Sequence, residues 1–140
     1  MRKYIPSLVW YRPFEPFAYA FIRFCTGAIF VTHGVYRLFY NGTAAELGPW
    51  FGHVSPPAIG AFELVGGAMI ALGLLTRPVA ILFAVEWFAA ALVAPGKPGT
   101  AWVLLSAPLH YPAMVAALCI GIVLRGGGHY SLDRLVGKEF

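Results

Sequence analysis

A carboxylate inside an apolar run of membrane length is the feature that most constrains this chain. Residues 57–75 read PAIGAFELVGGAMIALGLL, and the single charged residue among them is Glu63. An unpaired charge at the centre of a membrane helix costs about 2.5–3.5 kcal/mol on insertion scales. Such a group is normally paired, protonated or functional. Three more ionisable residues lie in other apolar runs, namely Arg23, His33 and Glu86.

The composition indicates that the lipid bilayer is the main solvent of the chain. Of its 140 residues, 59% are hydrophobic and only 11% are charged, and the mean hydropathy is +0.72. A soluble domain usually carries about a quarter charged residues. The net charge of +4 comes from scattered basic residues that mostly flank apolar runs. They are typical of topology signals, so we expect no nucleic-acid partner.

The apolar runs predict an all-α fold, a bundle of four transmembrane helices that forms one membrane domain over residues 1–140. The expected helices cover about residues 17–39, 57–75, 78–94 and 111–124, with a short interfacial segment at about 100–109. The first three reach the roughly 17–25 residues that a membrane span needs, and the fourth is shorter.

Basic residues predict the orientation of this bundle. With four spans, both termini and the turn at Arg77 share one side of the membrane, and that side carries seven lysines and arginines. The other side carries two, Arg37 and Lys97. The positive-inside rule therefore predicts a multi-pass protein of the plasma (inner) membrane with both termini in the cytoplasm.

The rise of an α-helix, about 1.5 Å per residue, predicts which ionisable groups share a depth. Arg23 lies about 9 Å and Glu86 about 12 Å from the cytoplasmic side, so we expect them to form a structural ion pair. His33 and Glu63 each lie six residues from the outer side, and His110 precedes the last helix there. These three residues are the candidate catalytic cluster, for redox or proton chemistry.

Glycine spacing predicts close helix packing. Residues 23, 27, 30, 34 and 37 recur on one face of the first helix, and small residues there admit a neighbour. Gly66 and Gly67 follow Glu63 on the second helix, where they would admit a partner helix or a flat ligand. Glu63, Gly66 and Gly67 are therefore the candidate cofactor-binding residues. A purely structural role for the ion pair and for the outer cluster stays open. We expect no metal site, because no ligand spacing supports one.

Three stretches of the sequence resemble the DoxX family of membrane proteins. The first helix carries one stretch, from Arg23 through His33-Gly34 to Arg37-Leu38, and the second is Glu63-Leu64-Val65-Gly66-Gly67 with Leu72-Gly73-Leu74-Leu75-Thr76-Arg77. The third is the tail from Arg125 through three glycines to Ser131-Leu132-Asp133. The resemblance covers roughly residues 18–135. It departs at His110, where many members have an acidic residue before Tyr-Pro.

The resemblance implies a small four-helix membrane protein. Some members of the family are subunits of thiosulfate:quinone oxidoreductase, and others belong to membrane complexes that handle thiols and oxidative stress. The leading hypothesis is therefore an accessory subunit of a quinone-linked redox complex that acts on sulfur compounds or oxidants. Glu63 with His33 and His110 would bind a quinone or pass its protons, and other oxidoreductase subunits would be the partners.

Two hypotheses from other classes stay open. One is a structural or assembly subunit of a larger membrane complex, without chemistry of its own. The other is a small transporter, for which self-association into a homo-oligomer would be needed, since four helices are few for a transport pathway.

Overall fold

The computed structural model of the chain describes residues 12–40, 56–93 and 107–137, and this part is all-helical. Its helices are α1 (Glu15–Phe39), α2 (Pro56–Leu72), α3 (Thr76–Val93), α4 (Ala107–Arg125) and the short α5 (Leu132–Leu135). No strand occurs within these described residues. The predicted all-α class is confirmed for this part of the chain.

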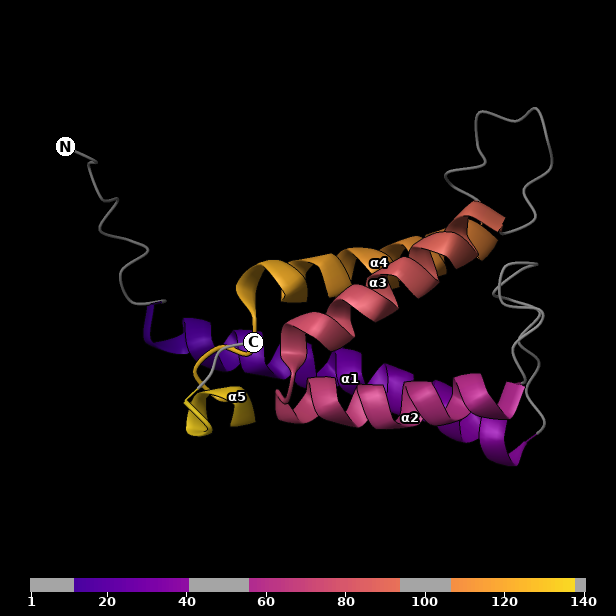
Figure 1. Cartoon of the computed structure of the whole chain (residues 1–140). Helices are drawn as coiled ribbons and strands as arrows, with labels where there is room; N and C mark the ends of the chain where they lie inside the picture. The colour runs from indigo at the N-terminus through magenta and orange to yellow at the C-terminus, as the bar shows by residue number, and fades with distance from the viewer. Residues whose placement is uncertain (1–11, 41–55, 94–106, 138–140) are drawn as a thin grey trace.

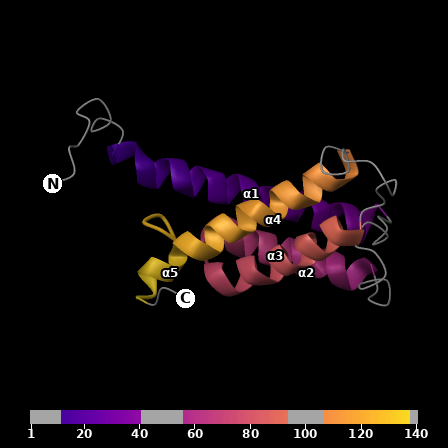
Figure 2. The ribbon, with the colours of Figure 1, turned by 90° about the horizontal axis from the view of Figure 1, so that it is seen from above.

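The four long helices form two antiparallel pairs. α1 packs mainly on α2, and α3 packs mainly on α4. In Figure 1 the first pair forms the lower layer and the second pair the upper one, and Figure 2 shows α4 and α3 crossing over the first pair. One end of the bundle therefore holds the start of α1, the turn from α2 into α3 and the end of α4. We call this the turn end.

The helix boundaries differ from the sequence prediction at the turn between α2 and α3. α2 ends at Leu72 and not at residue 75, because Gly73 adopts a positive φ of 73°. Left-handed glycine is a common helix terminator. α3 begins at Thr76, two residues before the predicted start at Pro78. Proline is tolerated there because the first turn of a helix needs no N–H donor.

The fourth helix is longer than the sequence predicted. It starts at Ala107 and continues through Pro112 to Arg125. Residues 107–109 of the predicted interfacial segment belong to this helix, and the remainder of that segment lies outside the described residues. The short α5 was not predicted.

Glycines bring α1 and α2 into close contact, as the spacing on α1 predicted. A Cβ atom on Gly34 would lie 2.5 Å from the backbone nitrogen of Leu64, and one on Gly27 would lie 2.5 Å from the carbonyl oxygen of Gly67. The face of α1 that carries these glycines is buried, and its other members are Arg23, Thr26, Phe30 and Arg37. Only hydrogen fits between the two backbones at Gly27 and Gly34.

Aromatic side chains join the two layers. The rings of Phe30 on α1 and Phe83 on α3 are fully buried and stacked, with centroids 3.8 Å apart. Phe83 lies over Gly66, where an added Cβ would come within 2.7 Å of the ring. The apolar core extends from this stack to Trp87, Cys119 and Ile122.

Large apolar side chains also cover much of the outer surface. Phe17, Phe21, Leu92 and Met114 are each more than half exposed. Exposed apolar surface of this extent is typical of contact with lipid or protein. Among the described residues, one segment, Arg12–Phe39, is long and apolar enough to cross a membrane, and Pro57–Leu72 and Tyr111–Arg125 are shorter apolar helices.

Candidate functional site

Two buried carboxylates and one buried guanidinium meet between three helices. Arg37 comes from α1, Glu63 from α2 and Glu86 from α3, and their exposures are 3%, 0% and 5%. Arg37 Nη1 lies 2.5 Å from Glu63 Oε1 and 4.0 Å from Glu86 Oε1. We call these three residues the acidic cluster. Within the part of the chain that the structure describes, its two carboxyl groups lie within ion-pair distance of one guanidinium.

Helix geometry explains how these side chains converge. Side chains on a helix lean toward its N-terminus. Arg37 lies two residues before the end of α1 and leans into the bundle. Glu63, seven residues after the start of the antiparallel α2, leans toward the end where α1 finishes. The glycine contact at Gly34 keeps the two helices close enough for a direct ion pair.

Polar atoms beside the acidic cluster have no hydrogen-bond partner within the described part of the chain. These atoms are Glu86 Oε2 and Trp87 Nε1, both buried. A buried polar atom without a partner costs about 1–3 kcal/mol, so such atoms are rare in folded proteins. Glu86 Oε2 therefore offers one acceptor, or a donor if Glu86 is protonated, and Trp87 Nε1 offers one N–H donor.

Three aromatic rings form a group that includes Trp87, the residue after Glu86 in sequence. His33 Nε2 and the Tyr111 hydroxyl form a hydrogen bond of 2.7 Å. The Trp87 ring contacts both of them edge-on, with centroid separations of 5.3 Å in each case. Tyr111 is 44% exposed, whereas Trp87 is 2% exposed. The group therefore runs from the surface of the bundle to the residue adjoining Glu86.

The predicted ion pair between Arg23 and Glu86 is wrong. The Arg23 guanidinium donates hydrogen bonds to the backbone carbonyls of Gly127 and Tyr130, and a longer one of 3.5 Å to that of Ala71. Glu86 lies instead beside Arg37. Depth alone suggested the pairing, but the lean of Arg23 toward the start of α1 carries its guanidinium away from Glu86.

The tail that follows α4 supplies a second polar group at the turn end. Asp133 is 2% exposed, and its carboxylate accepts hydrogen bonds from Leu75 N at 2.7 Å, Thr76 N at 3.0 Å and Thr76 Oγ1 at 2.8 Å. It thereby caps the first turn of α3 from 57 residues away. We call Arg23, Asp133 and the backbone groups that they bind the tail network.

Other candidate residues have different surroundings from those expected. Gly67 faces the backbone of α1 and Gly66 faces the Phe83 ring, so protein atoms occupy the place of the predicted cofactor. Glu63 has Arg37 as its ion-pair partner, and His33 has Tyr111 as its hydrogen-bond partner. The side chain of His110 lies outside the described residues.

Sequence reasoning missed three residues of this site: Arg37, Trp87 and Tyr111. Arg37 had a usable signal, because it lies on the same face of α1 as Arg23 and Gly34, yet the sequence analysis used it only as one of the two basic residues on the outer side. Trp87 and Tyr111 had only their positions next to Glu86 and His110 as signals.

Comparison with known proteins places the chain in a family. The sequence model of the DoxX family matches residues 18–96, which is more than half of the chain. A protein of Bacillus subtilis (strain 168), named "Putative oxidoreductase CatD", is 29% identical over 126 residues, which cover 84% of this chain and 85% of that protein. No solved structure matches the chain significantly. The matched region contains α2, α3 and all of α1 from residue 18 onward, and with them the whole acidic cluster. The chain therefore belongs to the DoxX family of membrane proteins.

Proposed function

We propose that this chain is an accessory subunit of a quinone-linked redox complex, in which the acidic cluster takes up and releases a proton. The observation that carries the proposal is that the acidic cluster has more carboxyl groups than cations. Among the described residues, two buried carboxyl groups, Glu63 and Glu86, share the guanidinium of Arg37. With both carboxylates ionised, the buried cluster would carry a net charge of −1.

A net charge is costly in an apolar interior, and two neighbouring carboxylates disfavour each other's ionised form. The neutral arrangement therefore holds one proton on one of the two carboxyl groups. Glu63 is in direct contact with Arg37, whereas Glu86 lies farther from it, and its Oε2 is buried without a hydrogen-bond partner among the described residues. Glu86 is for this reason the favoured carrier of the proton.

The residues around Glu86 fit a quinone. Quinone carbonyl oxygens accept hydrogen bonds, and Trp87 Nε1 is a buried donor without an acceptor among the described residues. Tyr111 brings the same aromatic group to the surface of the bundle, where a lipid-soluble molecule would arrive. A bound quinone would accept two electrons and two protons. Trp87 and Tyr111 would hold it, Glu86 would supply one of the two protons, and water at the surface beside the half-exposed Tyr111 would supply the other.

The electrons must come from a partner, because such chemistry is normally carried by a redox cofactor held in a suitable site. The name of the Bacillus relative supports an oxidoreductase context. As at the sequence level, sulfur compounds or oxidants are the proposed substrates. The proposal places four spans in the inner membrane with both termini in the cytoplasm, which the excess of basic residues on that side supports.

The test begins with purification of the full chain and its co-purifying proteins from native membranes in mild detergent. Bound quinone is extracted, and the reduction of a short-chain quinone analogue by thiosulfate is followed. The variants are Glu86→Gln and Glu63→Gln. Glu15→Gln is the matched control, because Glu15 is an exposed glutamate paired with Arg125. Loss of a general acid typically slows a reaction by about 100-fold or more.

The proposal expects extracted quinone, and a loss of this size in both cluster variants with the complex intact and the control unchanged. A complex without quinone, which dissociates in the cluster variants, would instead establish the assembly role. A lone protein that moves solute across reconstituted membranes would establish transport.

A further inference from the structure

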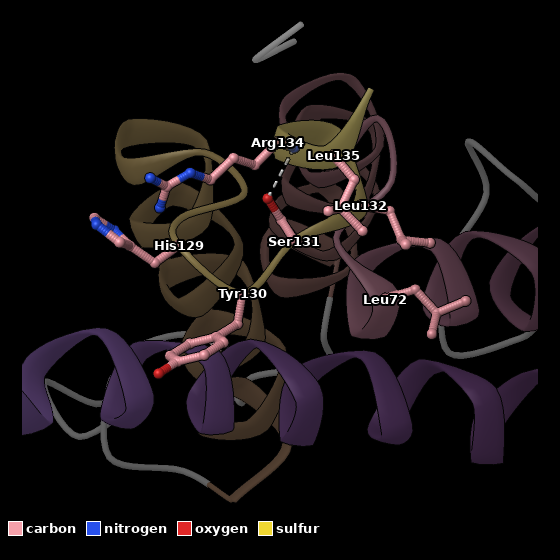
Figure 3. A pocket seen from close by; sticks show the side chains of 7 residues that line it. All are labelled: Leu72, His129, Tyr130, Ser131, Leu132, Arg134 and Leu135. Atoms are coloured by element: carbon pink, nitrogen blue, oxygen red, sulfur yellow. Dashed lines mark hydrogen bonds between the residues drawn. The ribbon is translucent and has the colours of Figure 1, made fainter. Parts of the chain in front are cut away.

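A pocket of about 500 Å³ lies at the turn end of the bundle, between the end of α2 and the tail. Its lining divides into two sides, which Figure 3 shows. His129 and Arg134 extend to one side, and Leu72, Leu132 and Leu135 lie on the other. Tyr130 lies below, directed toward α1. A cationic side next to an apolar side matches a molecule with an anionic head and an apolar body.

The tail network holds this pocket in place. Asp133 N donates to Gly73 O at 2.9 Å, and the Asp133 carboxylate binds the start of α3. Arg23 holds the carbonyls of Gly127 and Tyr130 from α1. Both walls of the pocket are therefore fixed to the bundle, so that little ordering is required when a ligand enters.

The cation in the pocket is available to a ligand. Among the described residues, no carboxylate lies within ion-pair distance of the Arg134 guanidinium, and its neighbour Asp133 is engaged by α3. Arg125, at the same end of the bundle, contrasts with it, because Arg125 pairs with Glu15 at 2.7 Å. Planar guanidinium groups bind phosphate oxygens well.

The apolar side of the pocket is exposed to an unusual degree. Leu135 is 82% exposed, the adjacent Val136 is 67% exposed and Leu72 is 58% exposed. Apolar side chains beside Arg134, at the end of a bundle in a family of membrane proteins, are placed as in an interfacial anchor.

We propose that this pocket binds an acidic phospholipid, with the phosphate against Arg134 and His129 and the acyl region over Leu72, Leu132 and Leu135. Charge complementarity favours an anionic headgroup over a zwitterionic one. The proposal does not depend on the redox function, because the pocket lies at the turn end and shares no residue with the acidic cluster.

Native mass spectrometry of the full chain tests this proposal. The protein is equilibrated with phosphatidylglycerol and phosphatidylcholine in equal amounts, and the retained lipid is identified. One basic residue at an anionic membrane surface contributes a factor of about five in affinity. We therefore expect the wild type to retain phosphatidylglycerol, and Arg134→Gln to retain about five-fold less of it. Arg125→Gln is the matched control, since it removes one arginine outside the pocket, and it should change retention less than two-fold.

A second variant, Leu135→Gln, tests the apolar side and should weaken retention while Arg134 is intact. Equal retention of the two lipids by the wild type would overturn the proposal. So would equal losses in Arg134→Gln and Arg125→Gln, which would indicate a diffuse charge effect. A protein segment cross-linked to residue 135 in native membranes, with no retained phospholipid, would overturn it in favour of a protein occupant.

Discussion

Two buried arginines on one face of α1 have opposite surroundings. Arg23 lies near the start of the helix and binds neutral backbone carbonyls of the tail. Arg37, fourteen residues later, meets two carboxylates. Both side chains lean toward the start of α1, so Arg23 leans out toward the turn end and Arg37 leans into the bundle. The same residue type on the same face therefore serves attachment in one place and charge balance in the other.

The two networks also differ in how well their carboxyl groups are hydrogen-bonded. In the tail network, the Asp133 carboxylate accepts three hydrogen bonds from α3 and the turn before it, and Arg23 donates through its two Nη atoms while its Nε is buried without a partner among the described residues. Beside the acidic cluster, Glu86 Oε2 and Trp87 Nε1 are buried without a partner among the described residues. Matched groups stabilise one structure, whereas groups left over are available to a proton or a ligand. The difference suggests that the tail network is structural and that the acidic cluster is the functional site.

The largest effect is expected from a variant that removes the cation of the acidic cluster. Arg37→Met leaves two buried carboxyl groups with no cation, which should lower the free energy of unfolding by about 4 kcal/mol. Unfolding in detergent micelles measures it. Adding Glu86→Gln to this variant should recover part of the loss, since one carboxylate is removed. Arg125→Met, which breaks an exposed ion pair, is the control and should cost less than about 1 kcal/mol. Equal losses in Arg37→Met and Arg125→Met would contradict the account.

The comparison is sharpened by the same conservative change in each network. Asp133→Asn replaces one carboxylate oxygen with an NH₂ group, which cannot accept a hydrogen bond from the backbone N–H donors of Leu75 and Thr76. We expect this variant to lower the free energy of unfolding by about 3 kcal/mol. Glu86 Oε2 has no hydrogen-bond partner among the described residues, so Glu86→Gln breaks no hydrogen bond at this atom. This variant should lower the free energy of unfolding by less than about 1 kcal/mol, while quinone-dependent activity is lost. Unfolding and activity measured on the same preparations check both. If Glu86→Gln were the more destabilising of the two, the assignment of roles would be reversed.

A smaller effect concerns the contact that brings Arg37 to Glu63. Gly34→Ala places a Cβ atom 2.5 Å from the backbone of α2, so the helices must separate, at a cost of about 2 kcal/mol. Separation should also weaken the Arg37–Glu63 pair and reduce activity. Gly121→Ala is the matched control, because nothing lies within 4 Å of the added Cβ and helix propensity favours alanine. An unchanged stability in Gly34→Ala would refute the close contact.

Much of the fold followed from the sequence, because burial and helix periodicity are local properties. The packed face of α1 and the close approach of a neighbouring helix to it were predicted from the spacing of Arg23, Gly27, Gly34 and Arg37, and the structure identifies that neighbour as α2. The pairing of charges was not, since depth along a helix does not fix which way a side chain turns. The capping of α3 by Asp133 could not be predicted either, because it joins residues that are 57 positions apart in the sequence.

The most direct test of the central claim is infrared spectroscopy of the purified chain in lipid, in H₂O and in D₂O. The chain has six acidic residues, so a protonated carboxyl group can be assigned with few variants. The account predicts a carbonyl band of a protonated carboxylic acid that shifts in D₂O. The band should vanish in Glu86→Gln and in Glu63→Gln, because the remaining carboxylate then pairs with Arg37, and it should persist in Glu15→Gln. A wild-type protein without this band, or a band that survives in both cluster variants, would contradict a proton held between Glu63 and Glu86.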